Sequence, residues 1–176
     1  MLLIEDETVI RWFPPLRYCW ALRGEQAQVP ITGRNAKRVL LGAINPRTGH
    51  RILGRAADLR QPDFQAFLRR LRHGYAGRPI WLLLDEAPSH TAGQSQLLAA
   101  QLHIRLIWLP KQCPELNAMD HLWREVKDEI TANYQFETID QAADYAEDWI
   151  RQLTTRQALR KAGVLSKNYW LKDLCK

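Results

Sequence analysis

The sequence has few cysteines and no long apolar run. Its three cysteines, Cys19, Cys113 and Cys175, are scattered and form no CxxC pattern, which excludes a disulfide framework and a structural zinc site. The longest strongly apolar run, Ile80–Leu84, is far below the roughly 20 residues that a membrane-spanning helix needs. The N-terminus soon turns acidic, unlike a secretory signal. We therefore expect a soluble cytoplasmic protein with no membrane partner.

Repeats, low-complexity stretches and Pro/Gly/Ser linkers are also lacking. The chain has 176 residues and a mass of 20.5 kDa, with 46% hydrophobic and 25% charged residues. This composition can build one hydrophobic core and argues against disorder. We predict a single domain over residues 1–176, with a core at about 1–131 and a helical extension at about 132–176.

Positive charge is in excess and unevenly placed. Lysine and arginine number 25 against 19 acidic residues, and residues 1–80 hold 14 basic and 6 acidic residues. Residues 151–176 carry seven basic residues against Asp173 alone. Such a distribution favours a polyanionic partner, of which nucleic acid is the commonest. A basic but merely soluble surface is the alternative.

Hydrophobic periodicity predicts strands first and helices later. Turn chemistry at 45–49 predicts a hairpin that joins strands 38–44 and 50–56. Apolar residues spaced i, i+3, i+4, i+7 predict a helix at 61–73. The predicted strands are 2–6 (with a continuation to 12), 38–44, 50–56, 80–84 and 104–109, and the predicted helices are 61–73, 92–102, 117–131, 137–154 and the start of 155–176. The strand–helix–strand order at 80–109 makes those two strands parallel neighbours. A mixed α/β sheet is therefore expected.

Three acidic residues stand out by position. Asp6 lies on the first strand, where alternation sends Glu5 and Glu7 to the opposite face. Asp85 ends a buried parallel strand, the place where open α/β sheets bind ligands. Asp120 lies in the first turn of the helix that follows the last strand. If the first strand lies beside 80–84, all three carboxylates meet at one edge of the sheet.

Clustered carboxylates oppose one another's ionisation, and Mg²⁺, which prefers oxygen ligands, resolves that conflict. Two such ions would activate a water or a 3′-hydroxyl at a phosphodiester and stabilise the leaving oxygen. Simpler interpretations exist for each acid. Asp85 is a favoured turn residue, Asp120 occupies a capping-box position after the predicted helix N-cap Asn117, and Asp6 alone is unremarkable.

The same residues resemble a known family. Leu82-Leu-Leu-Asp85-Glu-Ala-Pro-Ser-His90 resembles a strand ending in Asp-Asn-Ala-x-x-His, and residues 109–127 resemble Leu-Pro-x-x-Ser-Pro-x-Leu-Asn-Pro-x-Glu-x-x-Trp-x-x-x-Lys. Ile4-Glu-Asp6-Glu7 and Trp20-Ala-Leu-Arg23-Gly24 resemble its first-strand Asp-Glu and its Trp-x-x-Arg-Gly segment. The pattern is that of mariner-type DDE transposases, in the bacterial insertion-sequence branch.

The resemblance implies a ribonuclease H-like five-stranded sheet, with three early antiparallel and two later parallel strands. It implies DNA cleavage and strand transfer with Mg²⁺ or Mn²⁺, as two ions, in a bacterial, nucleoid-associated homodimer that holds transposon ends and target DNA. The implied roles are metal ligands for Asp6, Asp85 and Asp120, near-site residues for His90 and Asn117, and DNA phosphate contacts for Arg23 and Lys111. Trp20 and Trp123 are interpreted as packing residues, with base stacking as the alternative.

Three positions depart from the pattern. The insertion-sequence branch usually has Glu where this chain has Asp120, although mariner relatives carry Asp, and Glu86 replaces the Asn beside Asp85. Asp6 lies so near the start that no N-terminal helix-turn-helix module fits. The chain is therefore interpreted as a catalytic half alone, with three alternatives: a frameshifted second reading frame with a separate DNA-reading partner encoded upstream, a truncated copy, or an internal start. The alternatives are a catalytically silent DNA-binding fragment and another ribonuclease H-like nuclease acting in repair or RNA cleavage.

Overall fold

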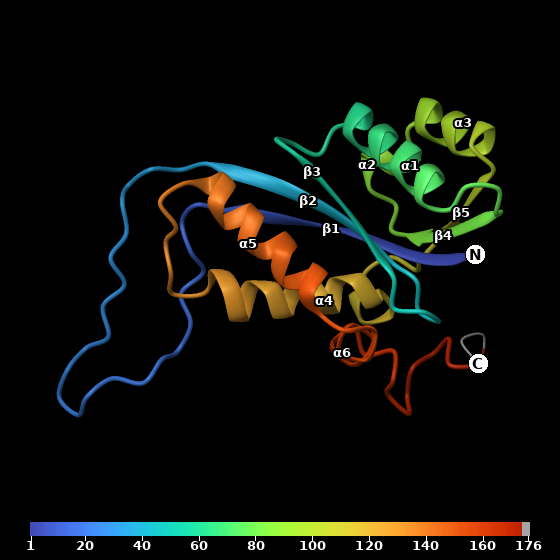
Figure 1. Ribbon diagram of the computed structural model, residues 1–176. Helices are drawn as coiled ribbons and strands as arrows, with labels where there is room; N and C mark the ends of the chain where they lie inside the picture. Colours follow the sequence, from blue (N-terminus) through green and yellow to red (C-terminus); the bar gives the residue numbers. More distant parts are fainter. Residues whose placement is uncertain (174–176) are drawn as a thin grey trace.

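A mixed five-stranded sheet forms the centre of the computed structural model, which describes residues 1–173 (Figure 1). The strands are β1 (Leu2–Arg11), β2 (Lys37–Ile44), β3 (Arg51–Ala56), β4 (Ile80–Leu84) and β5 (Ile104–Trp108), in the order β3-β2-β1-β4-β5. β2 is antiparallel to β1 and β3, whereas β4 is parallel to β1 and β5. The predicted fold class, with an early antiparallel and a late parallel half, is confirmed.

Helices cover both faces of this sheet (Figure 1). One group contains α1 (Gln61–Gly74), α2 (Pro88–Thr91) and α3 (Gly93–Gln101), and the other contains α4 (Ala118–Val126), α5 (Ile139–Gln152) and α6 (Thr155–Lys161). A π-helical turn, Lys127–Thr131, extends α4, and a 3₁₀ turn, Pro114–Leu116, precedes it. The predicted helices all occur, and α2 is an additional short one. Along residues 1–173, no helix is both long and apolar enough to cross a membrane.

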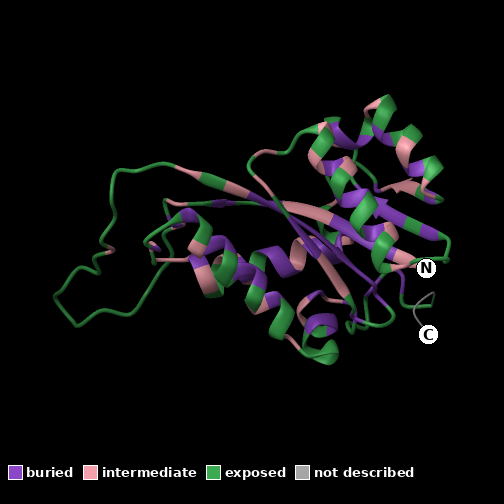
Figure 2. Cartoon of the chain, turned by 45° about the horizontal axis from the view of Figure 1, so that its top comes forward, coloured by how far each residue is buried: buried purple, intermediate pink, exposed green. Residues whose placement is uncertain are grey.

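Strand alternation in β1 divides the hydrophobic core into two layers. Ile4 and Ile10 belong to the layer against α4 and α5, whereas Leu3 belongs to the layer that contains Phe64 of α1. The buried positions of the sheet and of the helix faces turned toward it are continuous in Figure 2. Because side chains alternate along a strand, the acids of β1 are divided between the same two faces.

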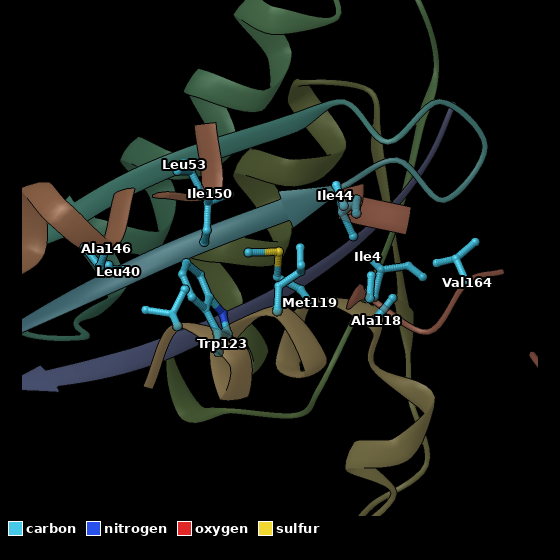
Figure 3. Close-up of a cluster of buried hydrophobic side chains, with 14 of the residues drawn as sticks. Ile4, Leu40, Ile44, Leu53, Ala118, Met119, Trp123, Ala146, Ile150 and Val164 are labelled. Atoms are coloured by element: carbon cyan, nitrogen blue, oxygen red, sulfur yellow. The ribbon is translucent and has the colours of Figure 1, made fainter. Parts of the chain in front are cut away.

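Helix α4 lies unusually close to the sheet at Gly42. A Cβ atom at this glycine would lie 2.4 Å from Met119 Cε and 2.6 Å from Trp123 Cζ2. Figure 3 shows Met119 and Trp123 packed against the sheet in this layer. Trp123 is buried, as predicted for a packing residue, and its Nε1 donates to the carbonyl oxygen of Asp6 at 3.3 Å. Since Gly42 pairs with Asp6 across β1 and β2, this contact holds α4 beside Asp6.

Residues 13–35 extend away from the body between β1 and β2 (Figure 1). We call this stretch the β1–β2 segment. Its base is tied to the chain after α4, because Arg17 Nε donates to Asp128 Oδ1 at 2.9 Å and Asn133 N donates to Pro15 O at 3.0 Å. Beyond the base, Tyr18 and Trp20 are fully exposed. The prediction that Trp20 is a packing residue is therefore wrong for the described residues, because the segment is exposed throughout residues 16–28.

The helix predicted at 137–154 corresponds to α5, which covers one face of the sheet. Most of its acids are exposed, but Glu147 is buried, and its carboxylate accepts from Arg55 Nε at 2.8 Å and from Arg151. Apolar periodicity could not predict this, since the partner Arg55 lies on β3. Glu147 therefore links α5 to the edge of the sheet.

Candidate active site

The three predicted carboxylates lie around the carboxyl end of β4. The parallel register pairs Ile4 of β1 with Leu83 of β4, and continuing it by two residues places Asp6 level with Asp85. Asp120 lies in the first turn of α4, which packs on β1. The three residues come from distant parts of the chain, so only the strand order β1-β4-β5 brings them together.

One pocket of about 350 Å³ contains all three. Its lining is Asp6, Asp85, Glu86, Ala87, Leu109, Pro110, Lys111, Gln112, Cys113, Pro114, Asn117 and Asp120. Lys111 is the single basic residue of that lining, and its Nζ lies 3.0 Å from Glu86 Oε2. The pocket is therefore dominated by carboxylates.

Asp6 is the carboxylate most affected by this environment. Burial raises its pKa to about 8, with further contributions from the negative charges of Glu7, Asp120 and Asp85. A divalent cation would relieve the repulsion, and carboxylate oxygens are the ligands that Mg²⁺ and Mn²⁺ prefer. The donor set of the pocket therefore fits such an ion.

Asn117 fixes the start of α4 and with it the position of Asp120. Its Oδ1 accepts from the backbone N–H groups of Met119 at 3.0 Å and Asp120 at 3.4 Å, so the predicted N-cap is confirmed. Its Nδ2 donates to the carbonyl oxygen of Glu5 at 2.8 Å. The buried Asn117 therefore ties the helix that carries Asp120 to the strand that carries Asp6.

The carboxylate of Asp120 does not form a capping box. It instead accepts from Arg124 one turn later, at 2.9 Å from Nε and 2.5 Å from Nη2. That arginine is exposed, and an i,i+4 ion pair at the surface contributes only about 0.3–0.5 kcal/mol. The capping-box interpretation is thus wrong, because the side chain turns toward Arg124 and the pocket rather than back to Asn117.

His90 lies directly beneath Asp85. Its Nδ1 lies 3.0 Å from Asp85 Oδ1, and its Nε2 lies 2.6 Å from Glu7 Oε1. The hydrogen bond from His90 is the main cause that lowers the pKa of Asp85. Burial alone would lower the pKa of His90, but the hydrogen bonds to Asp85 and Glu7 raise it to about 11. His90 therefore lies in the layer below the pocket, in contact with Asp85 but outside the pocket lining.

Glu5 and Glu7 were not among the predicted site residues. Both lie on the face of β1 opposite Asp6, as strand alternation predicts, and Glu5 is fully buried. The two carboxylate oxygens of Glu5 have no hydrogen-bond partner among residues 1–173. Burial, and next the negative charge of Glu7, hold its pKa well above the usual range. The sequence did contain a signal for these two residues. Alternation places them on the same face of β1 as the apolar Leu3, and two acidic side chains on one face of a buried strand are uncommon.

The two predicted DNA contacts lie in different places. Lys111 lines the carboxylate pocket, whereas Arg23 lies in the exposed β1–β2 segment and is not part of the pocket lining. The structure therefore brings together Asp6, Asp85, Asp120, Asn117 and Lys111, with His90 one layer below.

Comparison with known families agrees with this geometry. Residues 1–143 match the family model described as DDE superfamily endonuclease. The chain belongs to the DDE superfamily. The matched region includes every strand of the sheet and the pocket residues Asp6, Asp85 and Asp120, so the resemblance to this superfamily noted from the motifs is confirmed.

This DDE domain is also similar to an insertion-element protein. It is 32% identical over 133 residues to the "Insertion element IS630 uncharacterized 39 kDa protein" of Shigella sonnei, covering 74% of this chain and 39% of that protein. The chain thus spans well under half the length of that curated relative. The fold is that of an IS630/mariner-like transposase catalytic domain.

Solved structures of Mos1 transposase share the fold. The Mos1 transposase paired-end complex with left transposon end superposes with a TM-score of 0.72 at 18% identity, covering 96% of this chain and 53% of that chain. The Mos1 catalytic domain with raltegravir and Mg has a TM-score of 0.65 at 16% identity, covering 96% and 79%. A Mos1 catalytic domain with Mn is similar as well, at a TM-score of 0.67.

Proposed function

We propose that this DDE domain cleaves DNA phosphodiester bonds and transfers the resulting strands, using Mg²⁺ or Mn²⁺. The observation that carries the proposal is the single pocket in which Asp6, Asp85 and Asp120 meet. A structural role for these acids does not explain the grouping, because repulsion among them opposes ionisation of the half-buried Asp6. Mos1 catalytic domains, which share the fold, have been solved with Mg and with Mn.

Asp6, Asp85 and Asp120 would hold two ions in this proposal. Bound there, the ions would supply Lewis acidity that makes a water or a 3′-hydroxyl nucleophilic and stabilises the leaving oxygen. The protein's own work is positional. β1 and β4 hold two ligands in register, and the Asn117 cap, together with the Trp123–Gly42 contact, holds the third.

DNA is the proposed substrate, since relatives of this fold bind transposon ends. Lys111 lines the carboxylate pocket with a largely exposed side chain and would attract a phosphate beside the ions. Arg23 would contact DNA farther out, from the β1–β2 segment. In both cases the lysine or arginine side chain supplies positive charge without sequence specificity.

A nicking assay tests the proposal. The full chain is incubated with supercoiled plasmid and Mn²⁺ or Mg²⁺, and conversion to open circle is measured by gel. The wild type should nick only with metal, and Asp85→Ala should lose at least about 100-fold in rate, because a metal ligand is removed. Asp148→Ala is a matched control, since Asp148 is an exposed acid of α5 bonded to Arg151, and it should retain full activity.

Other outcomes separate the remaining hypotheses. Salt-dependent DNA binding without Mn²⁺ binding would indicate a catalytically silent fragment. Preference for RNA–DNA hybrids over DNA would indicate another ribonuclease H-like nuclease. Nicking that persists in Asp85→Ala, after contaminating nuclease is excluded, would overturn the proposal.

A homodimer is the proposed working form. The β1–β2 segment exposes Tyr18, Trp20 and Leu22, and large apolar side chains grouped at the surface mark interaction sites. The related Mos1 transposase forms a paired-end complex. We therefore propose that the segment packs on a second copy of the chain when two DNA ends are held together.

A further inference from the structure

A buried histidine joins the pocket to the opposite face of β1. His90 of α2 has no exposed surface, although α2 starts only three residues after the exposed Asp85. Its ring lies against Phe64 of α1 with centroids 4.3 Å apart. The backbone of α2 is fixed as well, because the buried Ser95 Oγ donates to Ser89 O at 2.7 Å. The ring is therefore held in one orientation.

Both nitrogens of this ring are hydrogen bonded. Nδ1 lies 3.0 Å from Asp85 Oδ1 and 3.1 Å from Asp85 O, and Nε2 lies 2.6 Å from Glu7 Oε1. Carbonyl and ionised carboxylate oxygens only accept hydrogen bonds, so the ring donates on both sides. Charge-assisted bonds of this kind are short and strong. The three side chains thus form a continuous line from Glu7 through His90 to Asp85.

Glu5, Glu7 and His90 also have the composition of a cation site, since their potential ligand atoms lie within 4.8 Å of one another. The distances argue against that use. Two ligand atoms on one ion at about 2.1 Å lie roughly 3.0–3.4 Å apart, whereas His90 Nε2 and Glu7 Oε1 are separated by 2.6 Å. That separation is a hydrogen bond, and Glu5 Oε2 lies 3.8 Å from the ring, beyond hydrogen-bond distance.

We propose that Glu7 and His90 position the carboxylate of Asp85, a role that rests on the proposed metal-dependent function. His90 and the N–H of Ala87, at 3.0 Å, both donate to Oδ1. Oδ2 has no hydrogen-bond partner within residues 1–173 and is the oxygen left for a cation in the pocket. Glu7 is the anchor, since it holds the far nitrogen of the ring.

Asp85 needs to be positioned because its side chain is exposed. The Asp85 side chain is 60% exposed at the end of a strand, so without His90 it would sample several rotamers, and ordering it on metal binding would cost free energy. Groups that orient metal ligands through hydrogen bonds typically contribute 10–100-fold in metal affinity. His90 is therefore a positioning residue and does not itself touch the ion.

Two substitutions at this one position test the idea. The amide nitrogen of His90→Asn lies near the place of Nδ1, so it keeps the bond to Asp85 and loses the bond to Glu7. The amide nitrogen of His90→Gln lies near the place of Nε2, so this variant keeps the hydrogen bond to Glu7 and loses the one to Asp85. Each variant loses one buried hydrogen bond, and their thermal stabilities should fall by similar amounts.

Mn²⁺ affinity, measured by isothermal titration calorimetry on the full chain, should separate them. We expect His90→Gln to bind Mn²⁺ about 10–100-fold more weakly than wild type, and His90→Asn to stay within about threefold. Equal losses in the two variants, or losses that merely follow the melting temperatures, would overturn the positioning role.

Glu5→Gln is the matched control, because Glu5 faces the same ring without bonding to it. It should bind Mn²⁺ like the wild type, and loss of a bound ion in this variant would instead place a cation among Glu5, Glu7 and His90. A wild type that binds no Mn²⁺ would overturn the proposed function and the positioning role with it. Unchanged binding in His90→Gln would overturn the positioning role alone.

Discussion

The two faces of β1 carry acids with opposite surroundings. Asp6 opens onto a pocket with Asp85 and Asp120, without a basic hydrogen-bond partner among the described residues. Glu7, one residue later, lies on the other face against the buried His90. The same strand thus carries an uncompensated carboxylate and a paired one, separated only by the alternation of the chain.

This difference indicates which of the acidic residues is available to bind a cation. A buried carboxylate with a cationic partner is already stabilised, and it serves the structure. A carboxylate surrounded by other negative charges is stabilised only when something positive arrives. We therefore assign the face of Asp6 to the proposed metal site, and Glu7 on the opposite face to the support of that site.

The largest expected effect comes from replacing a carboxylate by the corresponding amide on each face of β1. Asp6→Asn should weaken Mn²⁺ binding and DNA nicking by at least about 100-fold, since it removes a ligand charge. Glu5→Gln, an equally small change on the same strand, should leave nicking within about twofold, because the raised pKa of Glu5 already favours its neutral form. Equal effects of the two substitutions on the nicking rate would contradict the claim that the two faces of β1 have different roles.

The pH dependence of metal affinity should follow the protonation of Asp6. Its pKa of about 8 means that below pH 8 the metal-free protein holds a proton there, which a cation must displace. The Mg²⁺ dissociation constant should therefore fall about tenfold per unit as pH rises from 6 toward 8, and level off above. Calorimetry in buffers of different ionisation enthalpy should detect about one proton released at pH 6.5. A dissociation constant that stays flat between pH 6 and 8 would contradict this assignment.

A smaller effect is expected from moving α4 away from Asp6. Gly42→Ala introduces a Cβ 2.4 Å from Met119 Cε and 2.6 Å from the Trp123 ring, and such overpacking costs about 1–3 kcal/mol of unfolding free energy. Urea titration should show this loss, accompanied by weaker Mn²⁺ binding as Asp120 shifts. The control is Gly33→Ala, where no described atom lies within 4 Å of the added Cβ. Comparable destabilisation of the two variants would mean that close packing at Gly42 is unimportant.

The smallest effect on stability should come from the β1–β2 segment, which extends away from the body. The double variant Trp20→Ser, Leu22→Ser should change the unfolding free energy by less than about 0.5 kcal/mol, since both side chains are exposed. Light scattering of the DNA-bound chain should nevertheless shift from dimer to monomer. Leu97→Ser, an exposed leucine of α3, should leave the dimer intact. A dimer that survives the double variant would remove the segment from the interface.

Much of the sheet was predictable because its signals are local. Alternation in β1, the turn at 45–49 and the short apolar run Ile80–Leu84 each specify an element from neighbouring residues, and chain order then makes β4 and β5 parallel. The meeting of Asp6 with Asp85 required one further assumption, that β1 lies beside β4, and the observed strand order confirms it.

The supporting contacts were not predictable in the same way. His90 meets Glu7 only because α2 folds back beneath Asp85, and Glu147 is buried only because Arg55 of β3 reaches it. Trp20 was predicted to pack, but its segment leaves the body, and no local pattern distinguishes an exposed tryptophan from a buried one. Each of these outcomes depends on tertiary geometry between residues far apart in the chain.

The most direct test of the central claim is a crystal structure of the chain soaked in Mn²⁺, with anomalous diffraction recorded at the manganese edge. The account predicts anomalous peaks in the pocket within coordination distance of Asp6, Asp85 and Asp120, about 2.1–2.3 Å from carboxylate oxygens. It also predicts no peak between Glu5, Glu7 and His90. An empty carboxylate pocket, or a peak on the opposite face of β1, would contradict it.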